Sequence, residues 1–222
     1  MNRVSPPHYY IIAHGDYKGI ERFQSVLKEK GSFIIGANGG AAVALELGVL
    51  PQVVIGDGDS LDPQIRRHLE AMKVEFIDYP PEKDKTDTQL ALEYCIAHGA
   101  KKVTIIGAIG GRLDHSLANV FLLVLAKGHG INARIIDGAG ELFLLKAESI
   151  TLEGQPGDYL SLIPLTGKVT GVSGEGLKYP LYQETLYSGQ TRSISNELLL
   201  SQIKIEVKEG MLLLYFWHKH IS

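Results

Sequence analysis

The chain has 222 residues, of which 45% are hydrophobic and 21% are charged, and its 25 acidic and 22 basic side chains leave a formal net charge of −3. This apolar content excludes an intrinsically disordered chain, and no run of about 18 apolar residues is present to form a membrane-spanning helix. The charge is nearly balanced and there is no basic tract, so neither a membrane nor a nucleic acid is expected as a partner.

The N-terminal residues and the single cysteine favour a cytoplasmic protein. Residues 1–16 lack the long apolar core and the small-residue cleavage site of a signal peptide. Cys95 is the only cysteine and lies in an apolar pattern with Leu90, Ala91 and Tyr94 that is typical of a helix. We therefore expect a buried structural thiol in a reducing compartment.

Residues 9–136 alternate between short apolar runs and helix-like stretches. The runs are rich in β-branched residues, which is typical of strands covered on both faces, and they span 9–13, 33–35, 53–55, 74–77, 103–106 and 133–136. Helices are expected over 18–30, 39–48, 63–71, 87–98 and 114–127. The alternation predicts an α/β domain with a mostly parallel, Rossmann-like sheet flanked by helices.

Two of these helices carry start signals. Asp62 followed by Pro63 predicts an N-cap with proline at the first helical position. Thr86 followed by Gln89 three residues later fits a capping box.

The pattern changes after about residue 140 to strands separated by glycine-containing turns. The expected strands span 142–145, 149–152, 159–163, 168–170, 202–207 and 212–216, and no convincing helix is found among them. We expect two domains, an α/β domain over 1–145 and an all-β domain over 146–222. No flexible linker separates them.

The chemistry is expected in four glycine-rich or acidic loops of the first domain. Three of them directly follow predicted strands, and ligands of open α/β sheets bind at the carboxyl ends of strands. We therefore expect the loops to converge at one edge of the sheet.

Two carboxylates follow the third predicted strand in the segment Gly-Asp-Gly-Asp-Ser, residues 56–60. In an extended chain Asp57 and Asp59 face the same side, and their repulsion favours a compensating cation such as Mg²⁺. Asp87, in the first turn of a predicted helix, is placed to join them. The alternative is a solvated acidic turn.

The other loops offer groups for phosphate. Glycines 36, 39 and 40 around Asn38 suit close approach of a phosphate, although a tight strand–helix turn explains them equally well. Lys83 or Lys85 could contact a phosphate, or the segment 83–87 could serve only as a helix cap. Arg112 beside Gly110 and Gly111 supplies a fork of donors.

The segment that follows Arg112 has two readings. Asp114 is expected to orient the arginine or its loop. His115 is either a general base or, as we favour, a structural hydrogen-bonding residue.

Other catalytic signatures are missing from the sequence. There is no Walker P-loop, no His-Glu-x-x-His zinc helix and no Gly-x-Ser-x-Gly elbow. The segment 128–133 matches Gly-x-Gly-x-x-Ala, but it precedes a predicted strand, so a dinucleotide site is not expected there.

Taken together, the motifs resemble the thiamine pyrophosphokinase family. The resemblance spans nearly the whole chain in the same order, and it rests on six segments: 38–40 (Asn-Gly-Gly), 56–60 (Gly-Asp-Gly-Asp-Ser), 83–87 (Lys-Asp-Lys-Thr-Asp), 110–115 (Gly-Gly-Arg-Leu-Asp-His), 176–181 (Gly-Leu-Lys-Tyr-Pro-Leu) and 193–197 (Ser-Ile-Ser-Asn-Glu).

The resemblance implies an enzyme that transfers diphosphate from ATP to the hydroxyethyl group of thiamine, giving thiamine diphosphate and AMP. It also implies a homodimer with an α/β nucleotide domain and a β-sandwich-like, thiamine-binding domain. The implied Mg²⁺ ligands are Asp57, Asp59 and Asp87, which with Arg112 form the catalytic set.

The resemblance assigns the remaining site residues to two groups. The implied ATP-binding residues are Asn38, Gly39, Ser60, Lys83, Asp84, Thr86, Gly110, Gly111, Asp114 and His115. The implied thiamine-binding residues are Tyr179, Ser195 and Asn196, at or near the dimer interface. Some family members have Gln in place of Lys83, so the resemblance does not decide whether Lys83 contacts a phosphate. Some have Trp in place of Tyr179, which keeps an aromatic face but changes the area available for stacking.

The implied chemistry is direct in-line attack of the thiamine hydroxyl on the β-phosphorus, which depends more on charge neutralisation than on a covalent nucleophile. The candidates for a general base are Asp84 and Asp59. Two alternatives are a related diphosphokinase that acts on another hydroxymethyl heterocycle such as a pterin, and a non-catalytic thiamine or nucleotide sensor. The thiamine-side motifs disfavour the first, and the three aspartates disfavour the second.

Overall fold

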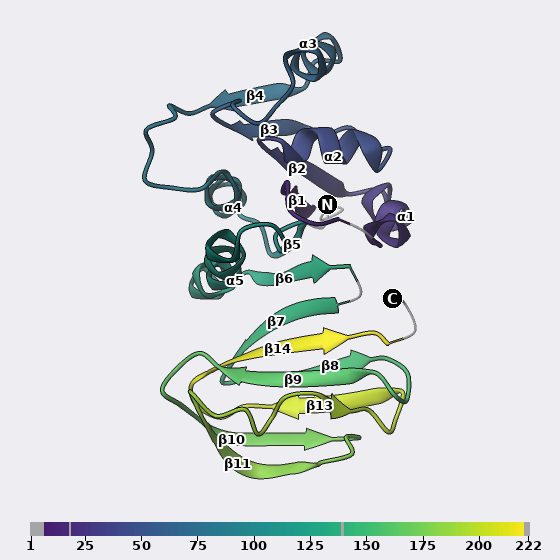
Figure 1. The fold of residues 1–222 in the computed structure, drawn as a ribbon, viewed down its shortest axis with the longest axis vertical. Coiled ribbons are helices and arrows are strands. Elements are labelled where there is room, and N and C mark those ends of the chain that lie inside the picture. The colour runs from purple at the N-terminus through teal and green to yellow at the C-terminus, as the bar shows by residue number, and fades with distance from the viewer. Residues whose placement is uncertain (1–6, 18, 139, 220–222) are drawn as a thin grey trace, which may run out of the picture. The chain divides into compact units, whose positions relative to one another are not determined.

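The computed structural model describes residues 7–17, 19–138 and 140–219, without the side chains of residues 21 and 22. The chain divides into two compact units, residues 1–138 and 139–222 (Figure 1). The boundary expected after residue 145 lies seven residues beyond this division, near the end of strand β7 (Gly140–Lys146). No helix within the described residues is both long and apolar enough to cross a membrane.

Parallel strands form the sheet of the first unit, as expected. They are β1 (His8–Ile12), β2 (Ser32–Ala37), β3 (Val53–Gly56), β4 (Glu75–Asp78), β5 (Lys102–Ile106) and β6 (Asn132–Asp137), in the order β6-β5-β1-β2-β3-β4. In this register Ile11 lies opposite both Ile35 and Ile105. The chain moves outward from β1 to β4 and then returns to β5, so the strand order switches between β1 and β5.

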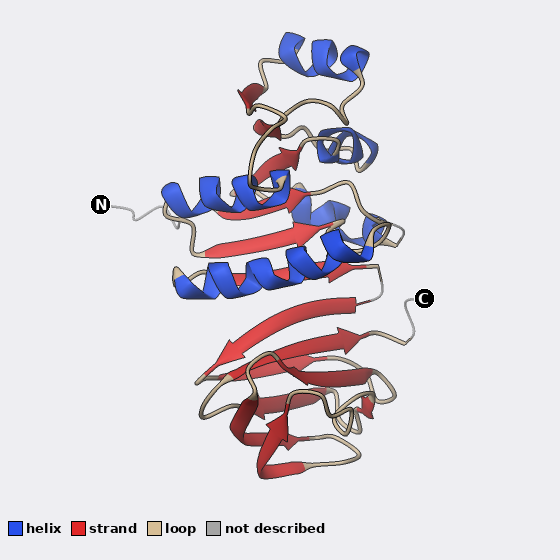
Figure 2. Ribbon diagram, turned by 60° about the vertical axis from the view of Figure 1, so that its left-hand side comes forward, coloured by secondary structure: helices blue, strands red, loops and turns tan. Residues whose placement is uncertain are grey.

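Helices cover both faces of this sheet. Successive side chains of a strand point to opposite faces, so these apolar strands need cover on both sides. Figures 1 and 2 show α1 (Gln24–Leu27) and α2 (Gly40–Glu46) on one face, and α4 (Asp87–Ala97) and α5 (Leu113–Gly128) on the other. Tyr10 packs in a buried cluster with Val43 of α2. Tyr9, its neighbour in β1, packs on Phe33 of β2, whose ring lies 6.2 Å from the ring of Tyr94 in α4.

Helix starts that depend on a cap residue are where the sequence predicts them. Asp62 accepts a hydrogen bond from the amide of Gln64 and begins α3 (Pro63–Ala71), and Thr86 accepts one from the amide of Gln89 and begins α4. In a complete capping box the Gln89 side chain would bond back to the backbone N–H of Thr86. Here it donates to Glu93 instead, at 3.1 Å.

The helix expected over residues 18–30 is wrong in length. Residue 18 lies outside the described residues, and the rest of the segment forms a 3-10 turn, η1 (Ile20–Phe23), followed by the four-residue α1. No side chain caps α1, and the chain turns at Gly31 with a φ of +98°. Without a cap, a helix this short depends on its buried Leu27 for stability.

The second unit is a β-sandwich, as the resemblance implied. Its strands are β7 (Gly140–Lys146), β8 (Ser149–Glu153), β9 (Tyr159–Pro164), β10 (Lys168–Glu175), β11 (Leu181–Tyr187), β12 (Asn196–Glu197), β13 (Gln202–Glu206) and β14 (Met211–Trp217). They pair antiparallel in the orders β12-β9-β14-β7 and β11-β10-β13-β8. Leu160, Leu214, Val172 and Ile205 meet in its core.

Strands β11 and β12 have no counterpart among the sequence-based predictions. β11 contains polar Gln183 in a left-handed conformation with a φ of +55°, and its pairing with β10 is interrupted by register shifts. This irregularity removes the regular alternation by which an antiparallel strand is recognised.

Cys95 and the segment 128–133 are as expected. The Cys95 thiol is fully buried in α4, and burial raises its pKa to about 12, so it is a structural thiol. Gly128 ends α5 and Asn132 begins β6, so the glycine pattern connects a helix to a strand and is not a dinucleotide motif.

A polar cluster lies at the amino ends of the strands. The His8 imidazole is 2.9 Å from the hydroxyls of both Thr104 and Tyr10, and its ring stacks on the Tyr10 ring. Burial, and then the charges of Lys102 and Arg134, lower the pKa of His8 from 6.5 to about 4. The folded protein therefore holds this histidine neutral.

We predict that His8 makes the protein acid-sensitive between pH 6.5 and 4. The unfolded chain takes up a proton at His8 below pH 6.5 and the folded chain does not, so stability is lost as pH falls through this window. The loss at pH 4 is about 1–3 kcal/mol for this half-buried group. Urea unfolding of a His8→Gln variant at pH 7, 5 and 4 is expected to show a smaller fall in the free energy of unfolding than the parent shows. His129→Gln, at an exposed helix end, is the control, and equal declines in all three proteins would refute the prediction.

Candidate active site

A cleft of about 790 Å³ opens at the carboxyl ends of the strands in the first unit. This volume is in the range of small-molecule sites, and the cleft lies at the switch in strand order between β1 and β5, where open α/β sheets bind ligands. The expected convergence of the loops is confirmed. The lining residues are 13–16, 37–39, 57, 59, 60, 81, 83, 85–88, 107, 108, 110–112, 115 and 119.

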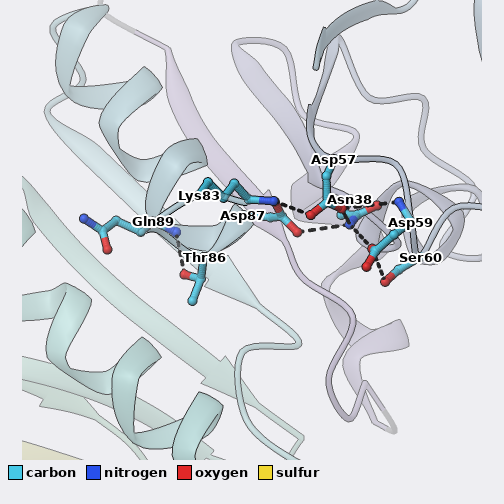
Figure 3. A network of polar contacts seen from close by, with 8 residues as sticks. All are labelled: Asn38, Asp57, Asp59, Ser60, Lys83, Thr86, Asp87 and Gln89. Carbon is cyan, nitrogen blue, oxygen red and sulfur yellow. Dashed lines mark hydrogen bonds and ion pairs between the residues drawn. The ribbon is translucent and has the colours of Figure 1, made fainter. Parts of the chain in front are cut away.

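Three carboxylates, which we call the acidic cluster (Asp57, Asp59 and Asp87), converge on one amide nitrogen. Asn38 Nδ2 lies 2.8 Å from Asp57 Oδ1, 2.8 Å from Asp59 Oδ1 and 3.0 Å from Asp87 Oδ2 (Figure 3). An amide nitrogen carries only two hydrogens, so the three carboxylates share them. Asn38 is buried, and its φ of +50° is a left-handed conformation that asparagine tolerates.

Lys83 supplies the positive charge next to this cluster. Its ammonium donates a hydrogen bond to Asp57 Oδ2 and lies 3.0 Å from Asp87 Oδ1. This hydrogen bond is the main reason that the pKa of Asp57 falls to about 2. Burial opposes the charge on Lys83, but its bonds to Asp57 and Asp87 outweigh that cost and raise the pKa of the lysine.

The loop after β3 places Asp57 and Asp59 on the same side, as the i, i+2 spacing predicts. Gly58 between them has a φ of +74°, and a Cβ there would lie 3.3 Å from Arg66 Nη1. Arg66 is in turn held by two hydrogen bonds to Asp78, of 2.9 and 2.8 Å. Arg66 and Asp78 therefore form a support directly beside the loop that carries the aspartates.

Close packing accounts for the glycines that follow Asn38. A Cβ on Gly39 would lie 2.8 Å from His14 Nδ1, and one on Gly40 would lie 1.8 Å from the carbonyl oxygen of Ile12. Helix α2 begins here against β1, so a side chain at Gly40 would require a backbone shift. The tight-turn interpretation therefore accounts for these glycines without a ligand.

The opposite side of the cleft is residues 107–115, which we call the arginine loop. Gly110 N donates to Ser116 Oγ at 3.1 Å, and Asn119 Nδ2 donates to the carbonyl of Ala108 at 2.8 Å, so α5 holds the loop at two points. A Cβ on Gly110 would lie 2.6 Å from Asp16 Cβ. This contact explains a glycine at that position.

Arg112 is oriented by Asp114, as expected. Its Nε and Nη2 donate to the two carboxylate oxygens at 3.1 and 2.5 Å, and these bonds lower the pKa of Asp114 to about 2. His115 lines the cleft, and its ring makes no hydrogen bond to another described residue. The structural role that we favoured for this histidine therefore has no support.

The cleft brings together all of the predicted ATP-side residues except Asp84 and Asp114. Asp84 is exposed and does not line the cleft, and Asp114 pairs with Arg112 but is not itself part of the lining. Of the two candidates for a general base, only Asp59 lines the cleft. Thr86 also lines the cleft, and its hydroxyl caps α4.

Sequence reasoning missed His14 and Asp16, which line the cleft from the loop after β1. This loop is tied to the arginine loop by backbone hydrogen bonds, Gly15 N to Gly107 O and Asp16 N to Ile109 O, both 2.7 Å. The signal was available, because residues 14–16 directly follow the first predicted strand and obey the same carboxyl-end rule.

The predicted thiamine residues lie in the second unit. Asn196 is buried and binds the backbone of Tyr179 twice, accepting from its N–H at 3.0 Å and donating to its carbonyl at 2.6 Å. The N–H of Ser195 donates to Ser161 Oγ at 3.0 Å. Asn196 thus fixes the backbone of Tyr179, whose side chain remains exposed.

The acidic cluster has the donor atoms of a Mg²⁺ site but is not arranged as one. No three carboxylate, histidine or cysteine side chains among the described residues form a preformed metal site. Asn38 and Lys83 nitrogens lie between the carboxylate oxygens instead. Two buried oxygens, Asn38 Oδ1 and Asp87 Oδ1, accept no hydrogen bond. Three carboxylate oxygens that surround one point, together with two further buried oxygens that lack a hydrogen bond, are the hard donors that Mg²⁺ prefers.

Two families match the sequence. Residues 24–135 match the family described as thiamin pyrophosphokinase, catalytic domain, and residues 148–212 match the one described as thiamin pyrophosphokinase, vitamin B1 binding domain. The thiamine pyrophosphokinase of Bacillus subtilis is 32% identical over 181 residues, which cover 81% of this chain and 85% of the relative.

Solved structures agree with these matches. A crystal structure of thiamine pyrophosphokinase from Bacillus subtilis has a TM-score of 0.86 at 28% identity and covers 96% of this chain and 99% of its own. One from Geobacillus thermodenitrificans has a TM-score of 0.82 at 29% identity, with 95% and 97% covered.

Proposed function

The chain belongs to the thiamine pyrophosphokinase family of ATP-dependent diphosphotransferases, and we propose that its cleft binds Mg²⁺-ATP and that its second unit binds thiamine. The observation that carries this proposal is the convergence of Asp57, Asp59 and Asp87 opposite Arg112 across one cleft. Arg112 can neutralise phosphate charge directly, and the aspartates would do so through a bound Mg²⁺, which together meet the need of phosphoryl transfer for charge neutralisation.

The acidic cluster is proposed to hold Mg²⁺ through its carboxylate oxygens. Asp57 and Asp59 lie in the loop after β3 and Asp87 is the first residue of α4, and all three already approach within 3.0 Å of a common nitrogen. When bound, the metal would neutralise phosphate charge and bridge the protein to ATP. Asn38 would remain the donor that keeps the three carboxylates together.

The phosphates of ATP are proposed to lie between the acidic cluster and the arginine loop. Arg112 is held by Asp114 with one guanidinium nitrogen, Nη1, not used in that pair, so it can bind a phosphate oxygen. The remaining proposed contacts to ATP come from Asn38, Gly39, Ser60, Lys83, Asp84, Thr86, Gly110, Gly111 and His115. Asp84 has the weakest support, since it is exposed outside the cleft lining.

The proposed reaction is a single displacement. The hydroxyl oxygen of thiamine forms a bond to the β-phosphorus, the bond from that phosphorus to the oxygen bridging to the α-phosphorus breaks, and AMP leaves with the electron pair. The hydroxyl loses its proton to a base, for which Asp59 is the better placed of the two candidates. The protein contributes positioning and fixed charge, with no covalent intermediate.

Thiamine is proposed to stack on the ring of Tyr179. The buried amide of Asn196 fixes the Tyr179 backbone, so the exposed ring is presented at low entropic cost. An aromatic face also attracts the positive thiazolium. Ser195, held at a φ of +56° beside Asn196, would supply a polar contact.

We predict that the full chain, incubated with ATP, Mg²⁺ and thiamine, forms AMP and thiamine diphosphate in equal amounts. The Asp59→Asn variant is expected to lose activity by roughly a hundredfold or more, because charge stabilisation of the transferring group is a large catalytic term. Its thermal unfolding in EDTA should match the parent, since the amide keeps the shape of the side chain.

Glu82→Gln is the matched control, since Glu82 is exposed and outside the cleft lining. Near-normal turnover of Asp59→Asn would remove Asp59 from the site. Turnover of a hydroxymethyl pterin without turnover of thiamine would favour the pterin alternative, and binding of ATP and thiamine without any product would favour the sensor.

A second prediction concerns thiamine binding. Tyr179→Ala is expected to raise the KM for thiamine about tenfold with little effect on the KM for ATP, because the lost contact is an aromatic stacking surface. Tyr179→Trp should restore binding. Tyr182→Ala is the control, since that tyrosine is even more exposed, at 74% against 66%. Equal effects at the two positions would refute a specific role for Tyr179.

The chain is also proposed to form a homodimer. Leu113, Leu117 and Phe121 are exposed apolar side chains spaced four residues apart along α5, so they form one stripe on the surface of the first unit. A second copy of the chain would bury this stripe.

Sedimentation at micromolar concentration is expected to give twice the 24.3 kDa chain mass for the parent. Phe121→Glu, which places a charge in the stripe, should shift the protein toward monomer. A monomeric parent would contradict the proposal.

A further inference from the structure

Lys83 occupies the position of a cation in the acidic cluster. Its ammonium contacts Asp57 Oδ2 and Asp87 Oδ1, while Asn38 Nδ2 contacts the second oxygen of each carboxylate (Figure 3). One charged and one neutral nitrogen therefore bridge the same two aspartates. These are the carboxylates that the proposed function assigns to Mg²⁺, and the inference below rests on that assignment.

The Lys83 contacts are largely withdrawn from water. The side chains of Lys83, Asp57 and Asp87 are 12%, 10% and 22% exposed. Two carboxylates this close and this buried repel each other strongly unless a positive charge lies between them. Lys83 supplies that charge within the chain itself.

The ammonium and a divalent cation require the same oxygens. A Mg²⁺ ion binds carboxylate oxygen at about 2.0–2.1 Å, and an oxygen used in that way faces the metal and not an ammonium. Asp87 Oδ1 accepts no hydrogen bond, since Lys83 approaches it without hydrogen-bond geometry. This contact is therefore the weaker of the two and the easier to exchange.

We propose that Lys83 is an internal cation that holds the acidic cluster together before the metal binds. The metal then displaces the Lys83 ammonium. Its side chain lines the same cleft, so the displaced ammonium stays in the region proposed for the ATP phosphates. The loss of its hydrogen bond to Asp57 and of its ion pair with Asp87 is then a cost of metal binding, and this cost weakens the affinity for Mg²⁺ in the absence of nucleotide.

Titration of Mg²⁺ alone into the full chain, by calorimetry without nucleotide, tests this competition. Lys83→Gln is expected to bind Mg²⁺ about tenfold more tightly than the parent, because the competing charge is gone. Lys85→Gln is the matched control. It removes the same charge two residues away, where Lys85 pairs with Glu93 at 2.8 Å. Equal affinities in the two variants would overturn the proposal, as would a failure of the parent and Lys83→Gln to bind Mg²⁺.

Thermal unfolding gives a second readout. In EDTA, Lys83→Gln should melt several degrees below the parent, since the cluster has lost its counter-charge, and saturating Mg²⁺ should close most of this gap. A gap that is the same in EDTA and in Mg²⁺ would contradict the exchange.

A third measurement uses only the parent protein and does not depend on how the variants fold. An amine-acylating reagent should label Lys83 slowly in EDTA and several-fold faster in Mg²⁺, while Lys85, read from the same peptides by mass spectrometry, should not change. An unchanged labelling rate at Lys83 would overturn the proposal.

These outcomes separate the inference from the proposed function. If the parent forms thiamine diphosphate while Lys83→Gln binds Mg²⁺ no more tightly than Lys85→Gln, the inference alone is wrong. If Lys83→Gln gains affinity while the parent forms no product, the proposed reaction alone is wrong.

Discussion

Repulsion among three carboxylates that are partly withdrawn from water is the constraint on which the first unit depends. Asp57 and Asp59 from the loop after β3 and Asp87 from the start of α4 converge on one amide nitrogen. Such a cluster is stable only where positive charge or hydrogen-bond donors lie between its members. The fold places Asn38 and Lys83 there, and Asn38 has a left-handed backbone directly after the end of β2. The carboxylates of the ligand-free protein are thus already arranged for a cation.

The parallel sheet makes this convergence possible. In the order β6-β5-β1-β2-β3-β4 every strand points the same way, so the loops after β1, β2, β3 and β5 all open at one edge. Close packing then limits what those loops can contain. Glycine at position 40 lets α2 begin against the backbone of β1, and glycine at position 110 lets the arginine loop pass Asp16. The antiparallel second unit uses a different device, in which a buried amide, Asn196, fixes the backbone of an exposed aromatic residue.

Local signals in the sequence predicted local features well. The caps at Asp62 and Thr86 and the i, i+2 placement of Asp57 and Asp59 depend on neighbours within a few residues, and each is confirmed. The strands are confirmed as strands, but β4 lies at the edge of the sheet and has no buried residue. The predictions failed where a local signal is weak or is overridden. Within residues 19–30, the described part of the expected first helix, the uncapped chain forms a 3-10 turn and one short helix, and the irregular β11 lacks the alternation of a strand. His14 and Asp16 were missed although they follow a predicted strand, because no glycine-rich or acidic pair marks that loop.

The sequence by itself determined the fold class, the family and the residue types of the site, because strand–helix alternation, capping and motif order are all properties of short segments. Only the tertiary structure decided which of these residues meet. The order of strands places β1 beside β5, so the loops after these two strands line the same cleft. Long-range packing brings Asn38 and Lys83 between the aspartates. Spacing along a chain does not encode the distance between loops, since that distance depends on which strands pair. Lys83, which from the sequence could be a phosphate contact or part of a helix cap, is identified as the counter-charge of Asp57 and Asp87 only by their contacts.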